Sequence, residues 1–409
     1  MMPKYLTIDD LDVKDKVVLV RVDFNSEIDL KTKKVTSDVR IRAHGESTIK
    51  DLSERGAKVV ILTHQGRKGE PDFISLEQHS RILGSILNRS VNFVDDIFGE
   101  KAQSAIKNLK SGEILVLENV RGFDGETKKG SPEEQAKTDL VKNLAPLADY
   151  FINDAFAAAH RGHVSLVGFT AVLPSAAGRI MEKELKSLSK AFENPEKPCL
   201  FVMGGAKADD SLEISRYVLN NKIADAVLTG GVTSQVFLAA EGFDLGENNI
   251  DFLAKKKVLD LIPGIKELIQ KYPKGIAIPE DLALNINGKR EEIAVNKLPT
   301  EYSIFDIGEK TIENYAKLIK KAKSIVLSGP MGVYEKPEFS TGTKRIFKEI
   351  ANSKAFSLAG GGHTISALNQ FGISDKISYI STAGGALIEF LMGKKLPCVV
   401  ALEEAAKRG

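Results

Sequence analysis

The stretch DAFAAAHRGH, residues 154–163, is the most informative part of this chain. It follows the apolar run Tyr150–Asn153, which has the composition of a short β-strand. His160, Arg161 and His163 therefore come just after the carboxyl end of that strand. Open α/β sheets bind ligands outside the carboxyl ends of their strands. Two imidazoles and a guanidinium in this position predict a site for an anion.

Three further apolar runs end in residues of the same kind. Val17–Val22, which contains Arg21, precedes Asp23, Phe24 and Asn25; Val59–Leu62 precedes Thr63, His64, Gln65, Gly66 and Arg67; Ile114–Leu117 precedes Glu118, Asn119, Val120 and Arg121. The repetition of Arg, His, Asn and Asp at strand ends favours one basic pocket for a small phosphorylated or carboxylated ligand.

Length and composition set the outer limits. A chain of 409 residues is longer than one hydrophobic core comfortably serves, so we expect two domains. The net charge of +2 lacks the basic excess that would favour a nucleic-acid partner. No apolar run approaches about 18 residues, and the start lacks the apolar core of a signal peptide. Cys199 and Cys398 form no metal or redox motif, so we expect buried thiols and a reducing cytoplasm.

Strand-like and helix-like patterns alternate through the chain, which predicts parallel sheets covered on both faces. In the first half the strand-like runs are 16–24, 58–63, 91–94, 113–117 and 150–152, and helical patterns include 40–54, 77–88 and 133–145. A charged helical pattern, 179–192, ends before Pro195. Further strand-like runs are 199–203, 226–228, 275–278, 302–305, 324–327, 355–358 and 377–380. Asn287-Gly288 predicts the turn of a hairpin over 285–290.

Glycine takes the place of Arg and His at the strand ends of the second half. The sets are Gly204-Gly205-Ala206-Lys207, Gly230-Gly231, Gly329-Pro330-Met331-Gly332, Gly360-Gly361-Gly362 and Gly384-Gly385. Glycine lets backbone N–H groups approach phosphate oxygens, and a following helix adds its positive end. These positions predict a nucleotide phosphate site. The chain has no Walker-type loop and no strand followed by a dinucleotide-binding glycine pattern.

A zinc site is the alternative for the strand-end histidines. His64, His160 and His163 are interleaved with arginines, however, and cations near cations disfavour a metal and favour an anion. His44 and His79 fall within helical patterns, and we interpret them as structural or exposed.

Ten collinear motifs make the chain resemble the phosphoglycerate kinase family, in its archaeal form, along essentially its whole length. They are RVDFN (21–25), DVRIRA (38–43), THQGR (63–67), LENVR (117–121), DAFAAAHRGH (154–163), GGAKADD (204–210), GPMGVYE (329–335), FSTGT (339–343), GGGHT (360–364) and STAGGA (381–386).

The resemblance implies an α/β fold with two Rossmann-like three-layer α/β/α domains, each with a parallel sheet, and a ligand cleft between them. The expected parts are a triose-phosphate-binding domain over 1–177, a hinge helix over 178–195, a nucleotide-binding domain over 196–391 and a tail over 392–409 that returns to the first domain. Gly384-Gly385 is a second expected hinge element.

The resemblance also implies the roles of individual residues. The expected substrate-binding residues are Asp23, Phe24, Asn25, Arg40, His64, Gln65, Gly66, Arg67, Arg121, His160 and Arg161. The expected nucleotide-binding residues are Gly204, Gly205, Lys207, Gly230, Pro330, Glu335, Gly360, Gly361, Gly362, His363 and Thr364, with Glu335 on the ribose and Pro330 near the base. Arg40 and Lys207 are the expected catalytic cations.

Four positions depart from the family pattern. Ala208 replaces a valine, Ser211 a lysine, Ser328 an asparagine and His363 an aspartate that would hold magnesium. We therefore expect no protein ligand for the metal: Mg²⁺ would be bound mainly through the nucleotide phosphates and water.

The implied reaction is reversible phosphoryl transfer between 1,3-bisphosphoglycerate and ADP, giving 3-phosphoglycerate and ATP, after the domains close. We expect a cytoplasmic enzyme with no nucleic-acid or membrane partner, monomeric or else dimeric. Two alternatives keep the fold: a sensor of a sugar phosphate and a nucleotide, and a kinase of a smaller acyl phosphate. Arg40 with Lys207 argues against a sensor, and the extended arginine set argues against a smaller substrate.

Overall fold

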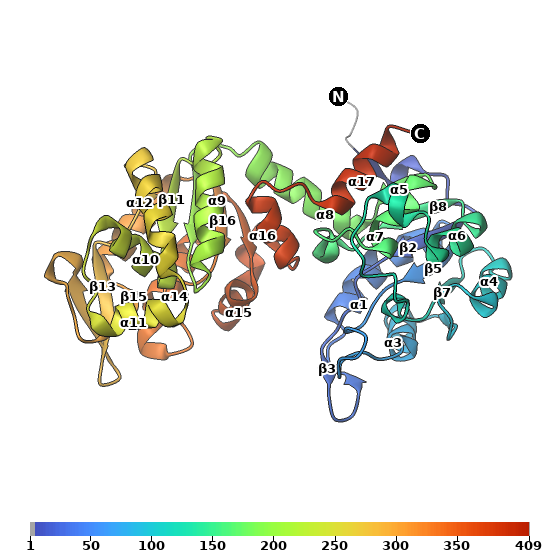
Figure 1. The fold of residues 1–409 in the computed structure, drawn as a ribbon, viewed down its shortest axis with the longest axis horizontal. Helices are drawn as coiled ribbons and strands as arrows, with labels where there is room; N and C mark the ends of the chain where they lie inside the picture. Colours follow the sequence, from blue (N-terminus) through green and yellow to red (C-terminus); the bar gives the residue numbers. More distant parts are fainter. Residues whose placement is uncertain (1–4, 409) are drawn as a thin grey trace. The chain divides into compact units, whose positions relative to one another are not determined.

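Alternating strands and helices build two parallel sheets, and each belongs to its own unit of the chain (Figure 1). The computed structural model describes residues 5–408. Unit 1 runs up to Leu185 and takes in the chain again from Lys395, whereas unit 2 spans Lys186–Lys394. The division falls inside helix α8 (Arg179–Leu188) and just before helix α17 (Pro397–Ala406).

Unit 1 contains a seven-stranded parallel sheet in the order β1-β9-β8-β2-β5-β7-β6. The strands are β1 (Leu6–Thr7), β2 (Val17–Arg21), β5 (Lys58–Leu62), β6 (Asn92–Phe93), β7 (Ile114–Val116), β8 (Tyr150–Asn153) and β9 (Ser175–Ala177). Along β2, Val18 and Val20 belong to one core and Leu19 to another. Both faces of this strand are therefore buried, as its continuous apolar sequence predicts.

The helices of unit 1 connect successive strands. They are α1 (Val39–His44), α2 (Lys50–Glu54), α3 (Glu77–Leu87), α4 (Glu100–Lys107), α5 (Pro132–Gln135), α6 (Asp139–Leu144) and α7 (Val164–Val167), with a π-helical segment η2 (Gly45–Ile49) between α1 and α2. Helix α17 adds Cys398, Ala401 and Leu402 to the buried interior of this unit. A short antiparallel pair, β3 (Ile28–Asp29) with β4 (Lys34–Val35), completes it.

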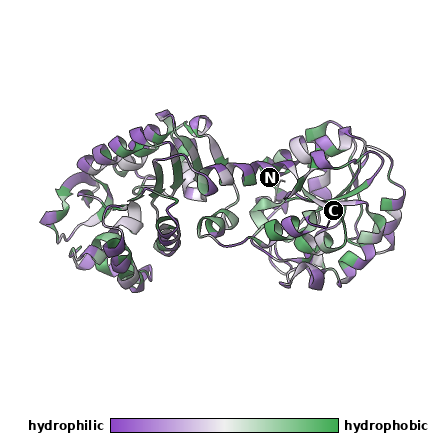
Figure 2. Ribbon diagram, turned by 90° about the horizontal axis from the view of Figure 1, so that it is seen from above, coloured by the Kyte–Doolittle hydropathy of each residue, from purple (hydrophilic) through white to green (hydrophobic). Residues whose placement is uncertain are grey.

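Unit 2 contains a six-stranded parallel sheet in the order β12-β11-β10-β16-β17-β18. The strands are β10 (Cys199–Met203), β11 (Ala226–Thr229), β12 (Ile276–Ala277), β16 (Ser324–Ser328), β17 (Phe356–Gly360) and β18 (Tyr379–Ser381). The helices are α9 (Ala208–Asn220), α10 (Gly231–Glu241), α11 (Glu247–Lys255), α12 (Ile262–Lys271), α13 (Glu309–Lys321), α14 (Thr341–Asn352), α15 (Gly362–Gln370) and α16 (Gly385–Leu391). Figure 2 shows the apolar strands of this sheet against helices with polar outer faces.

Two predicted elements were wrong in detail. The strand predicted at 302–305 is β15 (Ser303–Ile307), which lies outside the parallel sheet in an antiparallel sheet of order β14-β13-β15. The helix predicted over 133–145 is broken between α5 and α6, where the Thr138 hydroxyl donates to the Gln135 carbonyl at 2.7 Å. That bond satisfies a carbonyl at the end of α5, so the helix stops there.

The predicted hairpin is confirmed. Strands β13 (Asp281–Ile286) and β14 (Lys289–Ala294) pair in antiparallel register around Asn287 and Gly288. Both turn residues have positive φ, 52° and 84°, as a two-residue hairpin turn requires. Among the described residues, no helix is long and apolar enough to cross a membrane.

Candidate active site

A buried arginine lies among the residues at and just after the carboxyl ends of β2, β5, β7 and β8 in unit 1. We call this region the strand-end edge. Arg21 closes β2 and is only 2% exposed. Its Nε donates to Ser165 Oγ at 2.8 Å, and one guanidinium nitrogen donates to the Val22 carbonyl. Ser165 Oγ donates in turn to Glu126 Oε1 at 2.6 Å. The serine thus links a buried cation to a buried carboxylate, which lowers the cost of placing the charge inside the protein.

Arg21 also sets the protonation of His64. Its Nη2 lies 3.1 Å from His64 Nδ1, and because a guanidinium can only donate, Nδ1 is the acceptor. Burial, with help from nearby arginines, moves the pKa of His64 well below its usual value, although Asp23 opposes the shift. His64 is therefore a neutral imidazole whose proton sits on Nε2, and it offers one N–H donor to an anion.

Asp23 follows β2 and orients Arg40 of helix α1. Its Oδ2 accepts from Arg40 Nη1 at 2.5 Å, while the Arg40 side chain stays 40% exposed. Burial alone would raise the pKa of Asp23, but His64 and the charges of Arg40 and Arg21 outweigh burial and lower it. Asp23 is thus a carboxylate that holds Arg40 in place at the edge.

A chain of contacts joins Asp23 to the start of helix α8. The Asp23 N–H donates to His44 Nε2 at 3.3 Å, and His44 Nδ1 lies 2.6 Å from Asp154 Oδ2. Asp154 Oδ1 accepts from the N–H groups of Ile180 and Met181 at 2.8 and 3.2 Å. Asp154 therefore satisfies two donors in the first turn of α8 and fixes His44 at the same time. His44 is buried and structural, one of the two readings that its sequence position left open.

The loop after β5 is built by side chains that face inward. Gln65 is fully buried: its Oε1 accepts from the Ser26 N–H at 2.8 Å, and its Nε2 lies 3.2 Å from the Ser26 and Asp72 carbonyls. The Gly66 N–H donates to Asn25 Oδ1 at 2.9 Å. Gln65 and Asn25 therefore shape the loop in this structure, and so does Phe24, which is fully buried.

The remaining predicted substrate residues differ in exposure. Arg121 is half-buried, donates to the Gly66 carbonyl, and has its pKa lowered to about 10 by burial and then by Arg161. Arg161 is half-buried and its Nε donates to His160 Nε2 at 3.2 Å. Arg67 is exposed. Arg121 and Arg161 thus bring two positive charges close together, an arrangement that suits an anionic ligand.

Unit 2 has a different kind of site, a cavity of about 940 Å³ at the carboxyl ends of β10, β11, β16 and β17. Three of its loops pack on one another through backbone bonds. Gly205 N–H donates to the Pro330 carbonyl and Gly231 N–H to the Met331 carbonyl, both at 2.7 Å. The Gly329 N–H donates to Thr364 Oγ1 at 2.8 Å. Gly329 has φ of 92° and touches the Gly204 backbone, so a side chain there would be strained and would clash.

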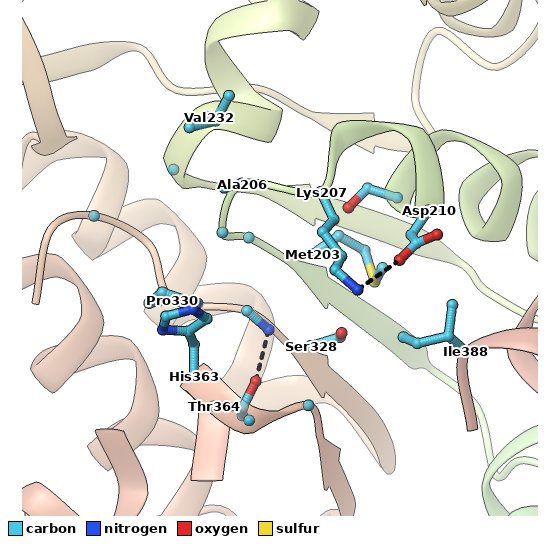
Figure 3. Close-up of a pocket in the computed structure, with 18 of the residues that line it drawn as sticks. Met203, Ala206, Lys207, Asp210, Val232, Ser328, Pro330, His363, Thr364 and Ile388 are labelled. Carbon is cyan, nitrogen blue, oxygen red and sulfur yellow. Dashed lines mark hydrogen bonds and ion pairs between the residues drawn. The ribbon is translucent and has the colours of Figure 1, made fainter. Parts of the chain in front are cut away.

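Lys207, Asp210, His363 and Thr364 are polar residues of the cavity wall (Figure 3), and we call their part of it the phosphate end. Lys207 precedes α9, its side chain is 81% exposed, and its Nζ lies 3.7 Å from Asp210 Oδ2. His363 and Thr364 stand in the first turn of α15, and His363 Nδ1 lies 3.8 Å from Glu335 Oε1. Helix N-termini and a lysine at one place form a site that suits phosphate.

Nine predicted nucleotide residues line this cavity and two do not. Those in the wall are Gly204, Gly205, Lys207, Pro330, Glu335, Gly361, Gly362, His363 and Thr364; Gly230 and Gly360 are outside it. Gly231, the first residue of α10, lines the cavity in place of Gly230, and the predicted Gly361 lines it next to Gly360. Gly384 and Gly385, expected as a hinge element, also line the cavity.

The other end of the cavity was missed by sequence reasoning. This wall, which we call the apolar end, is formed largely by α10, α11 and β15. It combines the apolar Val232, Phe252, Ile304 and Phe305 with the polar Gln235, Asn249 and Ser303. The sequence signal that could have indicated this part of the wall is the hairpin of β13 and β14. Strand β15 pairs with β13, and this pairing brings the residues of β15 to the cavity. Lys394, at the end of unit 2, is a further cation of the lining.

Comparisons with known proteins agree over both units. The family model for phosphoglycerate kinase matches residues 8–394. The phosphoglycerate kinase of Methanothermobacter thermautotrophicus is 48% identical over 402 residues, which cover 98% of this chain and 97% of the relative. That of Pyrococcus abyssi is 46% identical over 399 residues, 96% of each chain. The crystal structure of phosphoglycerate kinase from Pyrococcus horikoshii matches with a TM-score of 0.86 at 43% identity, covering 99% of this chain and 100% of the other.

The fold and these likenesses define a kinase that transfers phosphate to a carboxyl group. The chain belongs to the phosphoglycerate kinase family. Its function is that of phosphoglycerate kinase, a glycolytic enzyme, with phosphoglycerate and ADP or ATP as substrates.

The loop after β5 generates a prediction about pH and stability. His79 in α3 is fully buried, its Nε2 lies 3.2 Å from Gln65 Oε1, and burial lowers its pKa to about 4. The unfolded state, with an ordinary pKa near 6.5, binds the proton more readily, so this contribution is complete above about pH 6.5 and is lost as the pH falls towards 4. His79→Gln should reduce the acid-induced loss of unfolding free energy by about 3 kcal/mol at pH 4.

Urea unfolding from pH 7 to pH 4 measures this difference. His363→Gln is the matched control, because the His363 side chain is 79% exposed. Equal acid sensitivity of His79→Gln and the parent protein would show that His79 does not carry the effect.

Proposed function

We propose that the strand-end edge of unit 1 binds the triose phosphate and that the cavity of unit 2 binds the nucleotide. The observation that supports assigning one ligand to each unit is the distribution of charge. Unit 1 gathers Arg21, Arg40, Arg121 and Arg161 at one edge, whereas the cavity of unit 2 offers helix N-termini, Lys207 and an apolar end. A compact phosphorylated carboxylic acid with three negative charges suits the first site, and a nucleotide with a flat base and a phosphate tail suits the second.

The exposed cations of the two sites would stabilise the phosphoryl group in transit. In the direction of ATP use, a carboxylate oxygen of 3-phosphoglycerate attacks the γ-phosphorus, the bond from phosphorus to the ADP oxygen breaks, and ADP leaves with that electron pair. Arg40 would supply positive charge from the triose side and Lys207 from the nucleotide side. Arg67, Arg121 and Arg161, with the Nε2 donor of His64, would hold the remote phosphate. Because the two ligands bind different units, transfer requires the units to approach each other.

Magnesium would neutralise charge on the nucleotide phosphates. Among the carboxylates that line the cavity, Asp210 lies beside Lys207 and Glu335 lies near the imidazole of His363. This arrangement fits an ion that keeps its water and takes oxygens from the nucleotide, with His363 facing phosphate rather than metal.

Arg40→Ala should reduce turnover by about a hundredfold, because it removes charge from the moving phosphoryl group, and should leave ADP affinity nearly unchanged. Arg42→Ala is the matched control: Arg42 lies on the same helix, half exposed, and pairs with Asp38 and Glu46 instead. A coupled assay of 3-phosphoglycerate-dependent ADP formation, with calorimetry for ADP, measures both quantities. An Arg40→Ala enzyme that keeps half of the parent turnover would refute the proposed role.

His363→Ala should weaken ADP binding modestly and leave the magnesium dependence of the rate unaltered. The reason is that imidazole nitrogen is a poor ligand for a hard cation. Rates measured over a magnesium titration at saturating ATP test the point. A sharply raised magnesium requirement in this variant would instead make His363 a ligand of the metal.

A further inference from the structure

The apolar end of the unit 2 cavity contains two carboxamides with different hydrogen bonding. Asn249 on α11 is fully engaged: its Nδ2 donates to the Leu245 and Tyr302 carbonyls at 2.8 and 3.0 Å, and its Oδ1 accepts from the Ile304 N–H at 3.0 Å. Its role is to fasten α11 to β15. Gln235 on α10 is only half engaged, since its Nε2 donates to the Ile304 carbonyl at 3.1 Å and its Oε1 has no hydrogen-bond partner within residues 5–408.

The orientation of the Gln235 carboxamide is fixed by chemistry. The Ile304 carbonyl can only accept, so the nitrogen must face it and the oxygen must face the other way. Gln235 is 5% exposed and lines the cavity beside Val232 and Phe252. A buried acceptor without a donor is unfavourable, and most such groups find a partner. The missing partner here is a hydrogen-bond donor.

We propose that Gln235 selects the nucleobase by accepting a hydrogen bond from the 6-amino group of adenine. This inference rests on the assignment of the cavity to the nucleotide. The surrounding wall is apolar and suits the faces of a purine, whereas hypoxanthine has a 6-oxo acceptor where adenine has its donor. If the 6-oxo group of hypoxanthine faces Gln235 Oε1, neither of these two oxygens has a hydrogen-bond donor, so the site disfavours hypoxanthine. Because the oxygen is nearly covered by its neighbours, the carboxamide must move slightly outward to meet the base.

Calorimetric titration of the full chain with ADP and with IDP tests the proposal, in the parent protein and in Gln235→Met. The parent should bind ADP about tenfold more tightly than IDP, as one well-placed hydrogen bond allows. Gln235→Met should weaken ADP about tenfold and change IDP less than twofold, because IDP shares every other contact. Gln270→Met, at an exposed position on α12, is the matched control and should keep the parent ratio.

The outcomes separate the possible failures. Equal affinities of the parent for ADP and IDP would overturn the proposal even if Gln235→Met did not fold. An unchanged ratio in Gln235→Met, or equal weakening of both nucleotides, would reduce Gln235 to a structural residue. Lys207→Ala is measured alongside: if it weakens neither nucleotide, the cavity is not their site, and the assignment of the cavity fails together with the inference.

Discussion

The burial of the Arg21 guanidinium is the constraint on which the edge of unit 1 depends. Burial lowers the pKa of Arg21 and raises that of Glu126, yet the guanidinium stays charged because its ordinary pKa lies far above neutral. A buried cation must be surrounded by acceptors, and Ser165, the Val22 carbonyl and His64 Nδ1 supply them. The acceptor role of Nδ1 then leaves the His64 proton on Nε2. One buried charge thus determines which nitrogen of the neighbouring His64 can donate a hydrogen bond.

The two units offer different groups to an anion. Unit 1 uses side-chain cations supported by buried partners, and its loop after β5 is held by Gln65 and Asn25 from within. Unit 2 uses backbone N–H groups at helix starts, which require glycine where loops touch, as at Gly329. Several arginines suit a small substrate that carries several negative charges, whereas a glycine-lined cavity with an apolar end leaves room for a base.

Sequence predicted the parts of the fold that follow from local pattern. Apolar runs located all six strands of the parallel sheet of unit 2 but missed β1 and β9 of unit 1, which are only two and three residues long. Asn287-Gly288 located the hairpin, because that signal lies within a few residues. The family resemblance supplied the site residues, but not whether a side chain faces a ligand or the loop that carries it. Gln65 and Phe24 are buried, a result of packing between segments far apart in the chain. The apolar end of the cavity was missed for the same reason, since β15 reaches it only through pairing with β13.

The central claim is that each unit binds one substrate and that transfer needs both. Hydrogen exchange of the full chain with 3-phosphoglycerate alone, ADP alone and both ligands tests it most directly. We predict that 3-phosphoglycerate slows exchange in residues 63–67, 117–121 and 154–163, and that ADP slows it in residues 204–208, 230–235 and 361–365. With both ligands, protection of both sets should exceed that given by either ligand alone, as closure of the units requires. Protection of the unit 2 loops by 3-phosphoglycerate alone, with none in unit 1 at saturation, would contradict the account.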